Sequence, residues 1–152
     1  MAGTYDKTLV LSLMDKLSFF GQFTRDEKAE LAGFEHIVVR FDLGEHIINQ
    51  SEDDTSLFVL LKGEAEVTKK EAPGVILARL LPGAVLGEIS FISKKPRAST
   101  VVATTESMVL KMDQEMMDKV GPAIREKIKT YLLNLLIKRL DNMNMAILEH
   151  MR

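Results

Sequence analysis

The sequence contains no cysteine and carries no strong excess of charge of either sign. Without cysteine there is neither a disulfide framework nor a thiolate metal site, so we expect a reducing compartment, the cytoplasm. The 20 basic and 22 acidic residues leave a formal net charge of -2, which gives no general affinity for nucleic acid or an anionic membrane. Any anion that the protein binds must therefore be bound at a local site.

Long apolar runs are also absent from the sequence. The run Leu9–Met14 is too short to span a bilayer and is followed by charged residues, and the run Tyr131–Ile137 is interrupted by Asn134. We therefore expect no membrane-spanning or targeting segment. A chain of 152 residues is long enough for one domain with a hydrophobic core, and too short for two ordinary ones.

Recognisable catalytic and metal-binding patterns are missing. His36, His46 and His150 show neither His-x-His nor His-x-x-x-His spacing, so a metalloenzyme of cupin type is disfavoured. The sequence has no Gly-x-x-x-x-Gly-Lys-Ser/Thr loop and no Gly-x-Ser-x-Gly elbow. The acidic run Glu52–Asp54 lacks the glycine and the later glutamate of a cation-binding loop, and we interpret it as a solvated loop. We expect neither an enzyme nor a metal site.

The hydrophobic pattern predicts helices at the start of the chain and strands after them. Apolar residues at helical spacing predict a helix over Lys7–Phe20, and Thr24 with Glu27 reads as a capping box that opens a short helix ended by Gly33. Seven short runs follow, and their spacing predicts a small sandwich or barrel: Glu35–Phe41, His46–Asn49, Leu57–Lys62, Glu64–Lys69, Val75–Leu80, Arg97–Ala103 and Ser107–Met112.

Two further helices are predicted after the last strand. Asp113 starts a short helix to about Val120, and Pro122 is well placed at the first turn of a helix that could run to His150. At about 1.5 Å per residue this helix reaches roughly 45 Å, longer than the domain needs. One side could cover the barrel and the other a second copy of the chain, unless all its apolar residues are buried within one chain. They are Ile124, Ile128, Leu132, Leu136, Leu140, Met143, Ile147 and Met151, with Leu133, Ile137, Met145 and Leu148 widening the stripe.

Residues 81–101 break the alternating strand pattern and carry the most chemical information. Gly87 permits a positive φ or the close approach of a ligand, and Glu88–Ile92 is long enough for one or two helical turns. Amides at the start of a short helix attract an anion, and Arg97 adds a planar, permanent charge suited to phosphate oxygens. This combination indicates a ligand with both hydroxyls and a phosphate. The alternative is a surface ion pair between Glu88 and Arg97 that closes a loop.

The same stretch resembles the phosphate-binding cassette of the cyclic-nucleotide-binding domain family. Gly-Glu-Ile-Ser-Phe at 87–91 and Pro-Arg-Ala-Ser-Thr-Val at 96–101 are similar to two motifs of that family at its spacing. The resemblance, to the domains of bacterial catabolite activator proteins and protein kinase A regulatory subunits, covers roughly residues 10–148 and implies an α+β fold. The expected parts are an N-terminal helical segment (1–34), an antiparallel β-roll or jelly roll (double-stranded β-helix) with the cassette (35–112), and C-terminal hinge and dimerisation or lid helices (113–152).

The resemblance also implies roles for individual residues. Arg97 would bind the exocyclic phosphate oxygens, Glu88 the ribose 2′-hydroxyl, and the main chain of the cassette would make further bonds. The chemistry agrees, because an ionised carboxylate is acceptor-only and a guanidinium has no acceptor. The implied cyclic-nucleotide-binding residues are Gly87, Glu88, Ile89, Ser90, Arg97, Ala98 and Ser99.

In this family the final helix also closes over the base. Taking Lys138-Arg139-Leu140 as the counterpart of the family's basic-basic-Leu element, the base-facing positions fall at Met143 and Asn144. Met143 departs from the hydroxyl residue of the bacterial activators and could only pack on a purine face, whereas Asn144 could donate and accept. Both also have structural interpretations, helix packing for Met143 and exposed surface for Asn144. Ala98 favours cAMP over cGMP, because relatives that favour guanine tend to carry a hydroxyl there.

The sequence therefore predicts a non-catalytic sensor of a cyclic nucleotide, cAMP with cGMP possible, in which binding moves the C-terminal helix. As in bacterial members of the family, that helix would pair two subunits into a homodimer. No helix-turn-helix follows it before Arg152, so we expect no direct DNA binding. The alternative is a dimerising interaction adaptor of the same fold without a nucleotide ligand, and a cupin-type enzyme comes third. The sequence does not identify a downstream protein partner.

Overall fold

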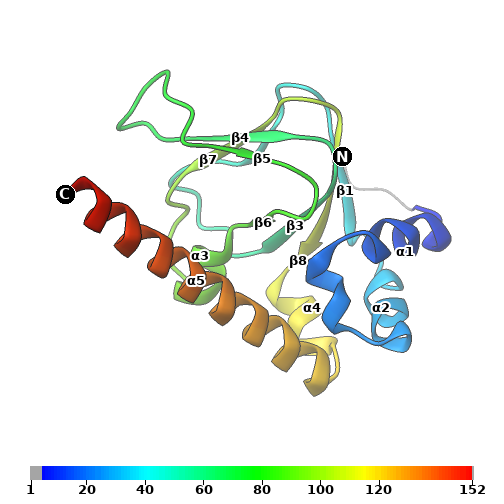
Figure 1. The fold of residues 1–152 in the computed structure, drawn as a ribbon. Helices are drawn as coiled ribbons and strands as arrows, with labels where there is room; N and C mark the ends of the chain where they lie inside the picture. The colour runs from blue at the N-terminus through cyan, green and yellow to red at the C-terminus, as the bar shows by residue number, and fades with distance from the viewer. Residues whose placement is uncertain (1–4, 152) are drawn as a thin grey trace. The chain divides into compact units, whose positions relative to one another are not determined.

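The structure is a computed structural model that describes residues 5–151. Residues 1–4 and 152, at the outer ends of the predicted segments 1–34 and 113–152, lie outside the described residues. The chain divides into two compact units, one ending at Val120 and the other beginning at Gly121. The first contains N-terminal helices and antiparallel sheets, and the second is one long helix (Figure 1), so the predicted α+β roll with helices at both ends is confirmed.

Three short helices open the first unit, α1 (Lys7–Asp15), the 3-10 helix η1 (Ser18–Gln22) and α2 (Arg25–Ala32). The single helix predicted over Lys7–Phe20 is wrong in its extent, because Leu17 has extended backbone angles, with φ −114° and ψ 134°. This break lets Phe19 and Phe20 pack edge to face in the core, with ring centroids 4.9 Å apart. Local helical periodicity could not reveal a break that tertiary packing stabilises.

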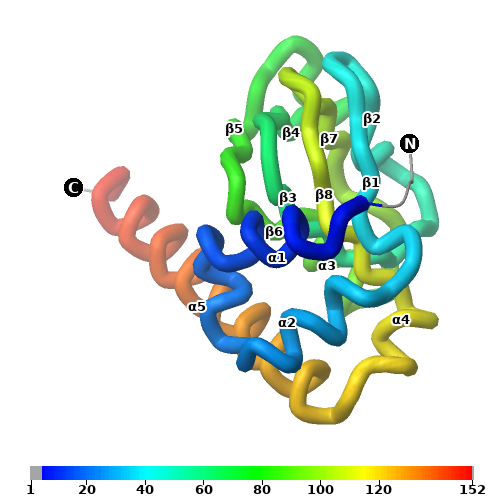
Figure 2. The backbone as a smooth tube through the Cα atoms, turned by 90° about the vertical axis from the view of Figure 1, so that its right-hand side faces the viewer, coloured from blue at the N-terminus to red at the C-terminus, as the bar shows by residue number. Residues whose placement is uncertain are grey.

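The capping box predicted for α2 is confirmed. The Thr24 hydroxyl accepts from the Glu27 amide at 3.2 Å, and the Glu27 carboxylate accepts from the Thr24 amide at 2.8 Å. These two reciprocal bonds satisfy donors that the first turn of a helix otherwise leaves unpaired. Figure 2 shows α1 and α2 side by side, and the Lys28 ammonium joins them through an ion pair with Asp15 at 2.9 Å.

Two four-stranded antiparallel sheets form the roll, with strand orders β1-β8-β3-β6 and β2-β7-β4-β5. Their inner faces enclose an apolar core that includes Ile48, Phe58, Leu60, Val101 and Val109. The strands are β1 (Val38–Phe41), β2 (His46–Ile48), β3 (Leu57–Lys62), β4 (Ala65–Thr68), β5 (Ala78–Leu80), β6 (Val85–Leu86), β7 (Thr100–Ala103) and β8 (Ser107–Met112).

The predicted strands agree best where an apolar run has sharp ends. β3 and β8 have the predicted bounds, whereas β1 begins three residues late, after His36 adopts a positive φ of 59°. The strand predicted from Arg97 begins only at Thr100, because the residues between them belong to the cassette. β6 was not predicted, because a strand of two residues carries no alternating pattern. It nevertheless pairs with β3, within the stretch 81–101 where the strand pattern was expected to break.

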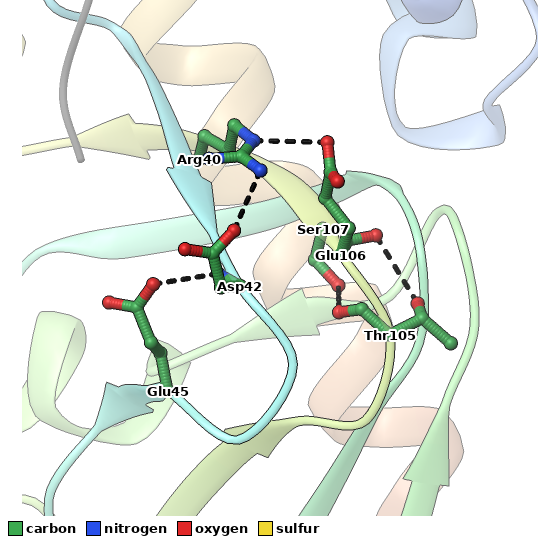
Figure 3. Close-up of polar contacts among 6 residues, drawn as sticks. All are labelled: Arg40, Asp42, Glu45, Thr105, Glu106 and Ser107. Atoms are coloured by element: carbon green, nitrogen blue, oxygen red, sulfur yellow. Dashed lines mark hydrogen bonds and ion pairs between the residues drawn. The ribbon is translucent and has the colours of Figure 1, made fainter.

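A polar cluster at the surface joins two turns of the roll (Figure 3). The Arg40 guanidinium on β1 pairs with Asp42 at 2.7 Å and with Glu106 at 3.0 Å, and the Glu45 carboxylate accepts from the Asp42 amide at 2.8 Å. The hydrogen bond from Arg40 lowers the pKa of the Glu106 carboxyl, and that from the Asp42 amide lowers the pKa of Glu45. Exposed pairs of this kind contribute little free energy to folding.

The remaining helices are α3 (Glu88–Ser93), α4 (Gln114–Lys119) and α5 (Pro122–His150). The predicted starts of the last two are confirmed: the Asp113 carboxylate caps α4 by accepting from the Met116 amide at 2.8 Å, and Pro122 occupies the first turn of α5. Among residues 5–151, no helix is long and apolar enough to cross a membrane.

The apolar residues of α5 fall into two groups. The first three of the predicted stripe, Ile124, Ile128 and Leu132, are buried, whereas the distal half of the helix leaves large apolar side chains exposed. The exposed group runs from 49% to 76% and comprises Leu133, Ile137, Leu140, Met143, Met145, Ile147, Leu148 and Met151. Contiguous exposed apolar side chains on one element are typical of an interaction surface.

Candidate functional site

The cassette begins with a left-handed residue between a short strand and a short helix. Gly87 joins β6 to α3 with φ 76°, a conformation that other residues rarely adopt. Its carbonyl accepts from the Phe91 amide at 3.0 Å and closes the first turn. Gly87 is the N-cap of α3 and has no side chain, so it cannot cap the amides of that turn as Ser, Thr or Asp would.

Arg97 is the buried cation of the cassette, with 4% of its surface exposed. Its Nη1 donates to the Gly87 carbonyl at 3.1 Å, and its Nη2 donates to the Ser56 carbonyl at 2.7 Å. The guanidinium lies 5.7 Å from the centroid of the Phe58 ring. Among the described residues, its Nε has no hydrogen-bond partner. Leaving a buried donor unpaired costs about 1–3 kcal/mol, so Nε keeps a hydrogen-bond donor that the described residues do not use.

Asp54 is the carboxylate that pairs with Arg97, a contact that the interpretation of Glu52–Asp54 as a solvated loop did not include, although all three acidic residues are exposed. Its Oδ2 lies 3.2 Å from Arg97 Nη2, and its Oδ1 accepts from the amide and the hydroxyl of Ser56 at 3.1 and 2.8 Å. Burial raises the pKa of the Asp54 carboxyl, but the Ser56 hydrogen bonds and the charges of Lys111 and Arg97 outweigh it, so the net shift is downward. Asp54 is therefore held in its ionised form.

The loop before β3 is tied to the main chain of Arg97. The Ser51 amide donates to the Arg97 carbonyl at 2.9 Å, and the Arg97 amide donates to the Glu52 carbonyl at 2.8 Å. The Gln50 amide donates to the Thr100 hydroxyl at 3.0 Å. These bonds fix the backbone on both sides of Arg97, so the fold itself positions the residue.

The other predicted cassette residues lie on the same short segment. Glu88 and Ser90, in the first turn of α3, are buried, whereas the Ile89 side chain is half exposed. Ala98 is exposed and Ser99 is partly buried, directly after Arg97. The structure thus places the Gly87 carbonyl against the Arg97 guanidinium, with Glu88 directly after Gly87 and the small residues Ala98 and Ser99 directly after Arg97. A donor-only cation and an acceptor-only carboxylate can bind one ligand that carries both an anion and a hydroxyl.

The two predicted base contacts lie outside the cassette, and three residues near Arg97 were not predicted. Met143 and Asn144 are exposed on the distal half of α5, in the second compact unit, and their role in base contact stays a prediction. Sequence reasoning missed Asp54, Ser56 and Lys111, because no short-range pattern links them to the cassette. Within residues 5–151, no group of three or more His, Cys, Asp or Glu residues is arranged to hold a metal ion.

Comparison with known proteins points to one family. The family model described as the cyclic nucleotide-binding domain matches residues 38–121, which contain the roll and the cassette. The cAMP-dependent protein kinase regulatory subunit of Dictyostelium discoideum is 25% identical over 134 residues. That match covers 82% of this chain and 41% of the relative, so the chain spans about two fifths of that protein's length.

Solved structures show the same fold. A cyclic nucleotide-binding domain from Methylobacillus flagellatus superposes with a TM-score of 0.75 at 23% identity, covering 93% of this chain and 82% of that one. The catabolite activator protein of Thermus thermophilus superposes with a TM-score of 0.72 at 21% identity, covering 85% of this chain and 61% of that one. The predicted resemblance to this family is therefore confirmed.

Proposed function

Because the chain belongs to the cyclic nucleotide-binding domain family, we propose that it is a non-catalytic sensor that binds cAMP at the cassette of residues 87–99. The observation that carries this proposal is the Arg97 guanidinium, which is buried beside a helix start without a side-chain cap and keeps an unpartnered Nε donor. Similarity to a cAMP-dependent protein kinase regulatory subunit supports cAMP as the ligand.

In this proposal different groups of the cassette bind the phosphate and the ribose of the nucleotide. The cyclic phosphate is bound by Arg97 and by main-chain amides of Gly87, Glu88, Ala98 and Ser99, whose small or absent side chains let the ligand approach the backbone. The Glu88 carboxylate accepts from the ribose 2′-hydroxyl. Ile89 and Ser90 belong to the same turn of α3 and keep its amides in position.

The base is recognised less specifically than the phosphate. Ala98 offers no hydroxyl for the exocyclic amino group of guanine, which favours cAMP over cGMP. In α5, the Asn144 amide is suited to the edge of a purine and the Met143 side chain to its face. We propose that α5 caps the base and that binding thereby changes the position of this helix. A ligand can shift such an equilibrium only through different affinities for the two helix positions, so the base contacts must exist in one position and be lost in the other.

A thermal shift experiment separates the sensor from a dimerising adaptor without a nucleotide ligand. A ligand that binds only the native state raises stability by RT ln(1 + [L]/Kd), about 2.7 kcal/mol at a concentration of 100 Kd. For a domain of this size we expect cAMP to raise Tm by about 5–10 °C. Adenosine, which lacks the phosphate, is the control and should leave Tm nearly unchanged. If cAMP and cGMP both leave Tm unchanged, the adaptor replaces the sensor.

We further propose that the exposed apolar residues on the distal half of α5 pair two chains into a homodimer. Leu140 is 57% exposed in the single chain, and a coiled-coil seam of three or four turns needs such residues. Leu140→Asp would bury a charge in the seam and should convert a dimer into a monomer in sedimentation equilibrium. Asn134→Asp, a polar substitution at an exposed position of the same helix, should leave the dimer intact. A monomeric wild-type protein at tens of micromolar would exclude this dimer.

A further inference from the structure

A second cation lies beside the Arg97 site and comes from a strand distant in sequence. Lys111 on β8 is the register partner of Phe58 on β3, so the two side chains lie on the same face of the sheet. The Lys111 ammonium is 5.7 Å from the centroid of the Phe58 ring, the distance at which the Arg97 guanidinium approaches the same ring. Phe58 is fully buried. One aromatic side chain therefore contacts both cations.

Both cations also act on one carboxylate, that of Asp54. Arg97 pairs with it directly at 3.2 Å, and the positive charge of Lys111 favours its ionised form. Asp54 and Arg97 alone form a neutral pair, whereas Asp54, Arg97 and Lys111 together carry one net positive charge. The Asp54 side chain is 39% exposed and the Arg97 side chain only 2%, so the carboxylate is the partner with room to move.

We infer that Lys111 is a positioning residue for nucleotide binding. When the ligand phosphate binds Arg97, the Asp54 carboxylate turns from Arg97 to the Lys111 ammonium. This inference rests on the proposed function. Asp54 accepts from Nη2 of Arg97, and a phosphate oxygen at the guanidinium would bring a second negative charge close to that carboxylate. Lys111 supplies the cation toward which Asp54 can turn, so Arg97 exchanges one anion for another without leaving a carboxylate unpaired.

The test is a double-mutant cycle on cAMP affinity, measured by calorimetric titration. Lys111→Met keeps most of the aliphatic side chain and removes the charge, and we expect it to weaken binding about 5- to 10-fold. Lys111→Arg should restore most of the affinity. Lys119→Met, which removes an exposed ammonium paired with Glu115 on α4, is the matched control and should leave affinity unchanged.

The Asp54→Asn background isolates the proposed route. The substituted amide oxygen can still accept from Ser56, but the competing negative charge is gone, so Lys111→Met should then have no effect on affinity. An equal loss in both backgrounds would show that Lys111 does not act through Asp54 and would overturn the inference. Unchanged affinity in Lys111→Met, with normal binding by the wild type, would overturn the inference alone, whereas a wild type without affinity for any cyclic nucleotide would overturn it together with the proposed function. Circular dichroism melting checks that each variant is folded.

Discussion

Replacing Arg97 by alanine should weaken cAMP binding by at least about 2–3 kcal/mol, or roughly 30-fold or more. The reason is that a phosphate charge in the cassette would lose the buried guanidinium that compensates it. The variant should also be less stable, because the Ser56 carbonyl loses the Arg97 donor and the Gly87 carbonyl keeps only its bond from the Phe91 amide. Titration calorimetry gives the affinity, and chemical denaturation gives the free energy of unfolding.

Two further variants separate charge from geometry at this position. Arg97→Lys keeps the positive charge but loses the planar fork, so its affinity should lie between those of the wild type and Arg97→Ala. Arg79→Ala is the matched control, because the Arg79 side chain on β5 is 74% exposed and its guanidinium lies 3.6 Å from the Glu66 carboxylate. Losing this exposed pair should change neither the cAMP affinity nor the free energy of unfolding measurably. A folded Arg97→Ala variant with wild-type affinity would remove Arg97 from the site.

Gly87→Ala should destabilise the protein through both backbone strain and overpacking. The residue has φ 76°, and an added Cβ would meet Nη1 of Arg97 and lie 2.9 Å from the Ser56 carbonyl oxygen. The strain of left-handed backbone costs about 1–2 kcal/mol, and overpacking adds a comparable amount, so we expect a total loss of about 3 kcal/mol. This corresponds to a decrease in Tm of about 10 °C. Because Arg97 would be displaced, cAMP affinity should fall as well.

Gly74→Ala provides a matched control for the backbone contribution. Gly74 has nearly the same φ, 75°, but an added Cβ would have nothing within 4 Å. Its loss should therefore be limited to the strain of the left-handed conformation, about 1–2 kcal/mol, with no change in cAMP affinity. Equal losses in the two variants would mean that the added Cβ at Gly87 is accommodated beside Arg97 without an overpacking cost.

The features predicted correctly from sequence depend on neighbouring residues. Thr24 and Glu27 are three residues apart and form a capping box wherever a helix starts there, so the start of α2 was predictable. β3 and β8 are apolar runs that end in turns, and their bounds were predicted from the pattern alone. The cassette was proposed from residues equally close in sequence, a glycine, an acid and an arginine within 11 consecutive residues, and its role in binding stays a prediction.

The features missed from sequence depend on residues that are far apart along the chain. Asp54 and Arg97 are separated by 43 residues, and no local pattern distinguishes the carboxylate of an ion pair from one in a solvated loop. Lys111 lies beside Phe58 only because β8 pairs with β3 in one register. The early end of α1 depends likewise on the packing of Phe19 and Phe20. Local sequence patterns thus predicted most of the elements, whereas the electrostatic environment of Arg97 required the tertiary structure.

Calorimetric titration of nucleotide-stripped protein shows whether the cassette binds a cyclic nucleotide. cAMP and then cGMP would be titrated into the wild type and into Glu88→Ala, which lacks the carboxylate assigned to the ribose hydroxyl. We predict micromolar or tighter binding of cAMP, weaker binding of cGMP, and a clear loss of affinity in the variant. The absence of heat and of a thermal shift with either nucleotide would contradict nucleotide binding by the cassette, and the dimerising adaptor would then explain the fold better.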